Sequence, residues 1–218
     1  MRLTDLDADW DRPFYRPLAF YLRFELGGEH YSNVDEPVPR FIQAFDRARA
    51  IADAVFQSST TLLAIIGASP HEPWTEAQDE NTQPPLRDGF VALRSLGFKF
   101  DTGPARTWSA RHPFFVDDDE IPEFSWQAFD ITGERLLRDT LIWDSVAHDM
   151  AIRPRASVDP FLVDFERGLM LHIYDDRGMD VYATEPRAVL SVYREFNKWL
   201  LDYDRPRIDA VMKPLMPN

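Results

Sequence analysis

The residues with the clearest chemical potential lie in one short stretch, 169–184, with the sequence LMLHIYDDRGMDVYAT. Its apolar residues predict two strands joined by a tight turn at 175–178. Asp175 suits the first position of that turn, because its carboxylate can accept a backbone N–H two residues further on. Gly178 suits the position after the turn, where we expect a positive φ.

The same hairpin contains side chains that can bind a divalent cation. Asp175, Asp176 and Asp180, with His172 on the neighbouring strand, could form a site of the oxygen-rich kind that Mg²⁺ or Ca²⁺ prefers. Alternatively, the two turn carboxylates organise the backbone and pair with Arg177, or they form an acidic tip that faces a protein partner. We expect the structural role first and predict no bound metal.

The common catalytic patterns are missing from the sequence. The chain has no cysteine, which excludes thiolate catalysis, disulfides and cysteine-ligated zinc. It has no G-x-S-x-G elbow, and its five histidines show neither H-E-x-x-H nor H-x-H spacing. We therefore predict no catalytic residue and no cofactor, although two acids distant in sequence can still meet in the fold.

Two polar stretches, 68–85 and 102–123, are candidates for contact with a partner. The second contains four consecutive acids that lack the alternating ligands and central glycine of a calcium-binding loop. We expect an acidic patch that captures arginine or lysine from another protein, with aromatic residues beside it. The predicted partner-binding residues are Trp74, Trp108, Asp117, Asp118, Asp119, Glu120, Asp175 and Asp176.

The charge balance points to the same class of partner. The chain has 24 basic and 37 acidic residues, giving a net charge of −13. A surface of that sign repels phosphate backbones and anionic lipids and attracts basic proteins. We predict no nucleic-acid partner and no membrane partner. No apolar run approaches the ~20 residues needed to span a bilayer, and MRLTDLDADW does not read as a secretory signal, so we expect a cytoplasmic protein.

The first half of the chain predicts a β-α-β unit. Residues 18–26 alternate between apolar and polar side chains, which indicates a half-buried strand. An amphipathic helix follows over 39–57, and the apolar run 60–67 predicts a strand covered on both faces. A parallel, right-handed crossover is expected for such a unit.

The second half predicts further helices and an antiparallel meander. After the irregular stretch 102–123, a strand is expected near 125–131 and a helix over 134–150. The other expected elements are a helix at 86–96 ending at Gly97, a strand at 98–100, meander strands at 158–165, 169–174 and 179–183, and a long final helix from Thr184 to about Tyr203, ended by Pro206.

These elements predict the α+β class, as one mixed α/β domain. We expect a mixed sheet with packed amphipathic helices, an N-terminal arm over 1–17 and a single domain over 18–218. No repeat and no change of composition divides the chain.

Two pairs of segments carry a resemblance to a known family. The first pair is YLRFEL with the helix RFIQAFDRARAIADAVF, and the second is HIYDDRGMDVYA with FNKWLLDYDR. Together they resemble a bacterial family of domains of unknown function. The resemblance implies a single bacterial domain and brings no assigned activity or catalytic residue.

The surplus of acidic residues and the absence of a catalytic pattern favour a binding protein over an enzyme. Our hypothesis is an acidic binding module, such as an immunity protein that neutralises a basic bacterial toxin, for example a nuclease. The alternative is a small enzyme with a scattered carboxylate site, with or without a divalent metal, near the 169–184 hairpin.

Overall fold

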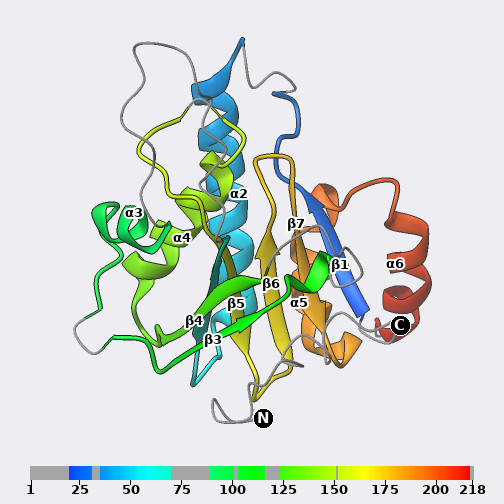
Figure 1. Cartoon of the computed structure of the whole chain (residues 1–218). Helices are drawn as coiled ribbons and strands as arrows, with labels where there is room; N and C mark the ends of the chain where they lie inside the picture. The colour runs from blue at the N-terminus through cyan, green and yellow to red at the C-terminus, as the bar shows by residue number, and fades with distance from the viewer. Residues whose placement is uncertain are drawn as a thin grey trace.

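The computed structural model describes residues 20–30, 35–69, 89–100, 103–115, 123–150 and 152–216. Within them, one seven-stranded sheet has the strand order β1-β7-β6-β5-β2-β4-β3 (Figure 1). The strands are β1 (Phe20–Glu25), β2 (Leu63–Ala68), β3 (Arg106–Ala110), β4 (Phe124–Asp130), β5 (Asp159–Asp164), β6 (Leu169–Ile173) and β7 (Gly178–Ala183).

The helices complete an α+β single domain, which confirms the predicted class. Pro37–Phe56 forms the longest of the described helices, α2. The others are α3 (Gly89–Ser95), α4 (Arg135–Ala147), α5 (Leu190–Glu195) and α6 (Arg205–Met212), with 3-10 turns η2 (Pro113–Phe115), η3 (Pro186–Val189), η4 (Asn197–Trp199) and η5 (Lys213–Leu215).

The pairing of the strands differs from the predicted mixed sheet. Every neighbouring pair in the described sheet is antiparallel. Strands β1 and β2 run in the same direction, as expected for the ends of a β-α-β unit, but β7, β6 and β5 lie between them. The reason is that the predicted meander is real, and short turns pair β5, β6 and β7 side by side before β1 adds to β7.

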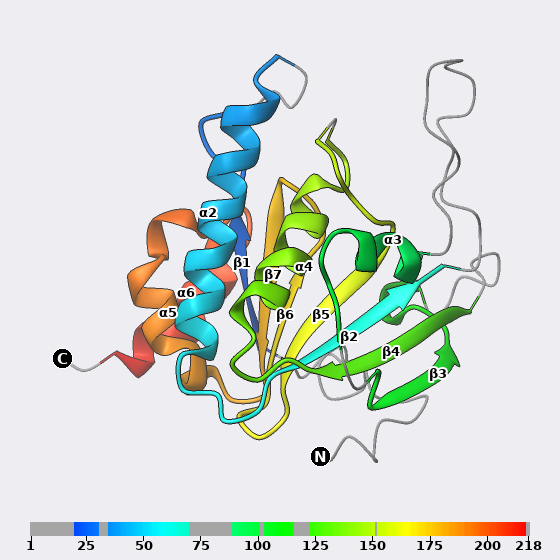
Figure 2. The same cartoon turned by 90° about the vertical axis from the view of Figure 1, so that its left-hand side faces the viewer.

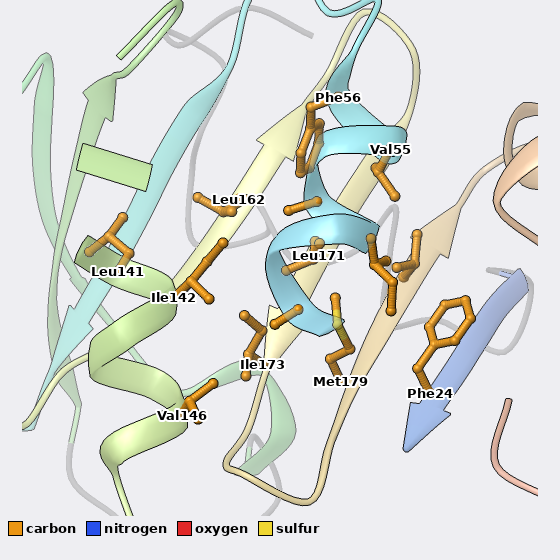
Figure 3. Packing of buried hydrophobic residues seen from close by; sticks show 14 of the residues in the cluster. Phe24, Val55, Phe56, Leu141, Ile142, Val146, Leu162, Leu171, Ile173 and Met179 are labelled. Atoms are coloured by element: carbon orange, nitrogen blue, oxygen red, sulfur yellow. The ribbon is translucent and has the colours of Figure 1, made fainter. Parts of the chain in front are cut away.

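The helices cover one face of the sheet, and the main hydrophobic core lies beneath them. Figure 2 shows α2 and α4 lying across this face, and Figure 3 shows Val55 of α2 and Ile142 of α4 gathered with Leu162, Leu171 and Ile173 of the strands. The alternation predicted for β1 is confirmed, since its buried and half-buried residues follow one another strictly. Strand β2 is buried along its whole length, as its apolar run predicted.

The opposite face of the sheet, here called the aromatic face, carries a second cluster of buried residues. Its members are Ile65, Ala110, Trp126, Ala128, Phe161, Val163, Met170 and Tyr182. Gly67 lies in this face directly opposite Trp126 in the β2–β4 register. A Cβ at Gly67 would lie 2.6 Å from the Trp126 ring, so the indole can pack there only because the residue is glycine.

Two predictions about the middle of the chain are wrong. The stretch 102–123 was expected to be irregular, but it contains β3 and the turn η2. β3 is an edge strand whose sequence, RTWSA, has a weak apolar pattern, so periodicity did not find it. The segment 98–100, expected as a strand, has no regular structure.

The predicted long final helix is broken into η3, α5 and η4. The chain leaves the helical conformation at Leu200, where ψ is 135°, and Leu200 then forms a bridge with Phe24. The next residue donates its backbone N–H to the carbonyl of Arg23 at 2.9 Å. Pairing with the outer edge of β1 therefore outweighs helical propensity. Pro206 lies in the first turn of α6 and does not end a helix. Tyr203, expected on a buried face, is 89% exposed.

Candidate functional site

The 169–184 hairpin crosses the aromatic face as β6 and β7. In its register His172 lies directly opposite Asp180. Both alternate with strand residues of the helix-covered core, so both belong to the aromatic face. The register therefore places both residues on one face, as the candidate cation site would require.

Two histidines share one carboxylate on this face. His172 Nε2 lies 2.7 Å from Asp159 Oδ1, and His112 Nε2 contacts Asp159 Oδ2. His112 and His172 are 2% and 3% exposed, whereas the side chain of Asp159 is 27% exposed. The three residues come from β5, from β6 and from the segment between β3 and η2. We call them the His112–Asp159–His172 cluster.

Hydrogen bonds determine the protonation states in the cluster. The backbone N–H of Phe114 donates to His112 Nδ1 at 3.2 Å, so Nε2 of a neutral His112 carries the hydrogen that Asp159 accepts. Burial raises the pKa of Asp159, but the charge of His172 and the hydrogen bonds from both imidazoles lower it more. The net pKa of this carboxyl lies well below its usual range, and Asp159 is therefore ionised at neutral pH.

Aromatic rings enclose His172. The ring of Phe161 lies nearly parallel to the imidazole, with 4.3 Å between centroids, and the centroid of Phe114 lies 4.8 Å away. Nδ1 of His172 is buried, and it has no hydrogen-bond partner among the described residues. A buried nitrogen without a partner is uncommon, and it marks His172 as a candidate functional residue.

Asp180 is held by a separate network. Arg23 of β1 donates Nε and Nη2 to the two oxygens of Asp180, at 2.8 Å and 2.9 Å, and the hydroxyl of Tyr182 donates at 3.1 Å. The hydrogen bond with Asp180 raises the pKa of Arg23, and burial with the nearby carboxylate raises the pKa of Tyr182. Both partners therefore keep their protons, and the carboxylate of Asp180 is fully engaged.

The turn behaves locally as its sequence predicted. Arg177 donates its backbone N–H to Asp175 Oδ1 at 2.7 Å and its Nε to Oδ2 at 2.6 Å. The prediction for Gly178 is wrong, because Gly178 is not among the glycines with positive φ. Glycine is needed there for space, since a Cβ would lie 2.1 Å from the hydroxyl of Tyr174 and 2.8 Å from the carbonyl of Phe24.

The expected acidic tip at Asp175 and Asp176 is not exposed. The two residues are 2% and 1% exposed. Asp176 forms an ion pair with Arg40 of α2, and Arg40 also donates to the backbone carbonyl of His30. Asp176 is turned inward because α2 supplies a cation beneath the turn, and Asp175 is buried in a pair with Arg177, so neither carboxylate is presented to a partner.

Of the other predicted partner-binding residues, Trp108 lies within the described ranges. It is half-buried in β3 and stacks on Trp126 with ring centroids 6.4 Å apart. Trp74, Asp117, Asp118, Asp119 and Glu120 lie outside the described residues.

Sequence reasoning did not find the His112–Asp159–His172 cluster. A partial signal existed, because the turn at 166–168 sets a hairpin register in which Phe161 faces His172, and Asp159 is two residues earlier on the same face. Nothing local connected His112 with the other two residues.

Two features of the described residues bear on the class of site. These residues contain no group of three or more His, Asp or Glu side chains arranged to hold a metal ion. None of their helices has the length and apolar character required to cross a membrane.

Comparison with known proteins identifies a family. A sequence model of the family described as Domain of unknown function (DUF3885) matches residues 5–204, which supports the resemblance to a family of unknown function. The comparisons with curated proteins and with solved structures find no match.

Proposed function

We propose that this chain, which belongs to the DUF3885 family of domains of unknown function, is an acidic binding module that captures a basic protein. The specific form that we favour is an immunity protein that neutralises a basic toxin of bacterial origin, such as a nuclease.

The distribution of charge along the chain carries this proposal. Of the 37 acidic and 24 basic residues, 23 and 20 lie in the described ranges, which leaves 14 acidic and 4 basic residues in the other segments. Of the net charge of −13, the described ranges therefore carry −3 and the other segments carry −10. Most of the surplus belongs to the stretches that contain Trp74 and Asp117–Glu120, which are among the predicted partner-binding residues.

The pairing of the buried acids also indicates that most of the surplus negative charge lies outside the described ranges. Asp176, Asp180 and Asp175 are neutralised by arginines of their own chain. These hairpin carboxylates are committed to the fold, so the acids that attract a partner are those elsewhere. Concentrated surplus charge speeds the encounter with an oppositely charged protein and makes the association sensitive to salt.

The test compares two variants of equal net charge. One replaces Asp117, Asp118, Asp119 and Glu120 by their amides. The control replaces four exposed acids of the described part by their amides, namely Glu134, Glu185, Glu195 and Asp202. Each protein is immobilised, exposed to a lysate of the source organism at low and at high salt, and the retained proteins are identified.

We expect the wild type and the control to retain a basic protein at low salt, and the 117–120 variant to lose it. Toxicity of the recovered protein, and its relief by the wild-type chain, would then establish the immunity role. Absence of any salt-sensitive basic partner would reject the proposal, and so would equal loss of binding in both variants.

The second candidate, an enzyme with its site near the hairpin, is favoured by the buried Nδ1 of His172. A carboxylate that orients a histidine, with the second ring nitrogen unpaired, is the arrangement that general acid–base catalysis uses. Calorimetric titration with Mg²⁺, Mn²⁺ and Ca²⁺ tests the form that requires a divalent metal. That form is rejected if none of the three releases heat or shifts the melting temperature.

A further inference from the structure

A pocket with a volume of about 240 Å³ lies between α2 and α4, within the helical layer and remote from the aromatic face. Phe45, Leu136, Trp143 and Pro154 form apolar walls, and Asp139 and Thr140 add polar atoms. A volume below the roughly 300–1,000 Å³ of sites for drug-sized ligands suits a compound with one ring or a short aliphatic chain.

The apolar walls are held in place before any ligand arrives. The rings of Phe45 and Trp143 meet edge to face with centroids 5.9 Å apart, and Trp143 Nε1 donates to the carbonyl of Pro154 at 2.9 Å. Leu136 is 76% exposed, so this wall opens to solvent. A preformed apolar pocket of this kind binds with little loss of side-chain freedom.

Beside the pocket, two arginines form ion pairs with two aspartates. Arg135 Nη2 donates to Asp53 Oδ2 at 2.8 Å. Arg138 Nη2 donates to Asp139 Oδ1 at 2.8 Å and also lies 2.6 Å from Asp53 Oδ1. The two carboxylates are therefore already engaged by two arginines.

Arg49 is the third arginine of this group, and its ion pairs with carboxylates are long. Its guanidinium lies over the ring of Phe45, 5.3 Å from the centroid, and Phe45 lines the pocket. Its Nε is 3.4 Å from Asp139, and Nη1 is 4.0 Å from the exposed Asp46. Nε is nevertheless buried without a hydrogen-bond partner among the described residues. A guanidinium has five N–H donors in a planar fork that matches a carboxylate. Arg49 can therefore still donate hydrogen bonds to the carboxylate of a ligand.

We propose that this pocket binds a small carboxylic acid with an apolar body. The body fills the space between Phe45, Leu136 and Trp143, and the carboxylate receives hydrogen bonds from Arg49. A cationic ligand would place its charge against the guanidinium of Arg49 and is therefore disfavoured. This site is independent of the proposed capture of a basic protein, which rests on other segments of the chain.

The test uses three probes of one shape and different charge: 3-phenylpropionate, 3-phenylpropionamide and 3-phenylpropylamine. Binding to the full chain is followed by NMR through the indole N–H signal of Trp143, assigned with the variant Trp143→Phe. We expect the carboxylate to bind at least about fivefold more tightly than the amide, because a charge-assisted hydrogen bond is the stronger one. The amine is expected to bind most weakly.

Three variants separate the contributions. Arg49→Gln is expected to reduce the affinity for 3-phenylpropionate to that for the amide and to leave amide binding unchanged. Thr140→Phe, which fills the pocket, is expected to abolish binding of both probes. Arg194→Gln, an exposed arginine on α5, is the matched control and is expected to bind as the wild type does.

Several results would overturn the proposal. No shift of the Trp143 signal with any probe would do so, and so would an amide or amine that binds as tightly as the acid. The proposal also fails if Arg49→Gln and Arg194→Gln bind 3-phenylpropionate with equal affinity, since Arg49 would then not be the group that binds its carboxylate. An unfolded variant is recognised by its amide spectrum. In that case the order of affinities of the three probes for the wild type still tests the proposal.

Discussion

Arg40 and Asp176 form an ion pair in the protein interior although 136 positions separate them in the chain. Their side chains are 8% and 1% exposed. The pair attaches the turn of the β6–β7 hairpin to α2, and it explains why an acidic turn that looks like a surface tip is buried. Desolvation of two charges is tolerated only while both remain together.

We therefore expect Asp176→Asn to lower the free energy of unfolding by about 3 kcal/mol, because it leaves the guanidinium of Arg40 buried without its anion. The double variant Arg40→Met/Asp176→Leu is expected to recover part of this loss. Urea denaturation at neutral pH measures both values. The control is Asp202→Asn, which breaks an exposed pair with Arg205 and is expected to change stability by less than about 0.5 kcal/mol. If Asp176→Asn costs no more than the control, the pair is not a structural element.

Asp144 on α4 gives a prediction about pH. Its side chain is fully buried, Oδ1 accepts the backbone N–H of Ala156, and Oδ2 has no hydrogen-bond partner among the described residues. Burial raises the pKa of Asp144 from 3.8 to about 7, against the opposing effects of the Ala156 hydrogen bond and of Arg155. The folded state therefore holds a proton that the unfolded state releases near pH 4.

Because the pKa is raised on folding, the contribution of Asp144 to stability is complete below pH 3.8 and is lost as the pH rises through about 7. Between pH 5 and pH 8 we expect the wild type to lose about 2 kcal/mol through this group. Asp144→Asn retains the acceptor oxygen and cannot ionise, so its loss over the same range should be smaller by that amount. Chemical denaturation of both proteins at several pH values measures the difference. Parallel curves for the two proteins would contradict the assignment.

Gly67 and Trp126 provide a prediction about packing. A methyl group at Gly67 would lie 2.6 Å from two atoms of the Trp126 ring, which is fully buried. We expect Gly67→Ala to displace the indole and lower the free energy of unfolding by about 2 kcal/mol. Thermal denaturation and the near-ultraviolet circular dichroism of tryptophan report the two effects. In the background Trp126→Leu, where the ring is absent, the added methyl group should cost much less; an equal cost there would show that backbone conformation is responsible.

The features that the sequence predicted are those that neighbours in the chain determine. The alternation of β1, the apolar run of β2 and the bond from the Arg177 N–H to Asp175 each depend on residues a few positions apart. The meander was found for the same reason. Binary pattern and turn chemistry were sufficient for these elements.

The features that it did not predict depend on partners far away in the chain. Asp176 was expected at the surface because nothing near it indicates Arg40. The helix expected to reach Tyr203 ends early because Leu200 and Leu201 pair with β1; Leu200 and its bridge partner Phe24 are 176 positions apart in the chain. The candidate site has the same character, since Asp159 joins His172 through a hairpin register but meets His112 only after β3, β4 and β5 have assembled.

The His112–Asp159–His172 cluster gives the last prediction. Asp159 has a pKa held well below its usual range by the two imidazoles, so its contribution to stability is present at neutral pH and is lost as the pH falls below the value of an unfolded aspartate. Asp159→Asn removes a charge that accepts hydrogen bonds from both histidines, and we expect a loss of about 2 kcal/mol at pH 7. The difference from the wild type should shrink as the solution is made acidic. Chemical denaturation of both proteins at pH 7 and at acidic pH measures the two differences. Equal stability of Asp159→Asn and the wild type at pH 7 would show that this carboxylate does not hold the cluster together.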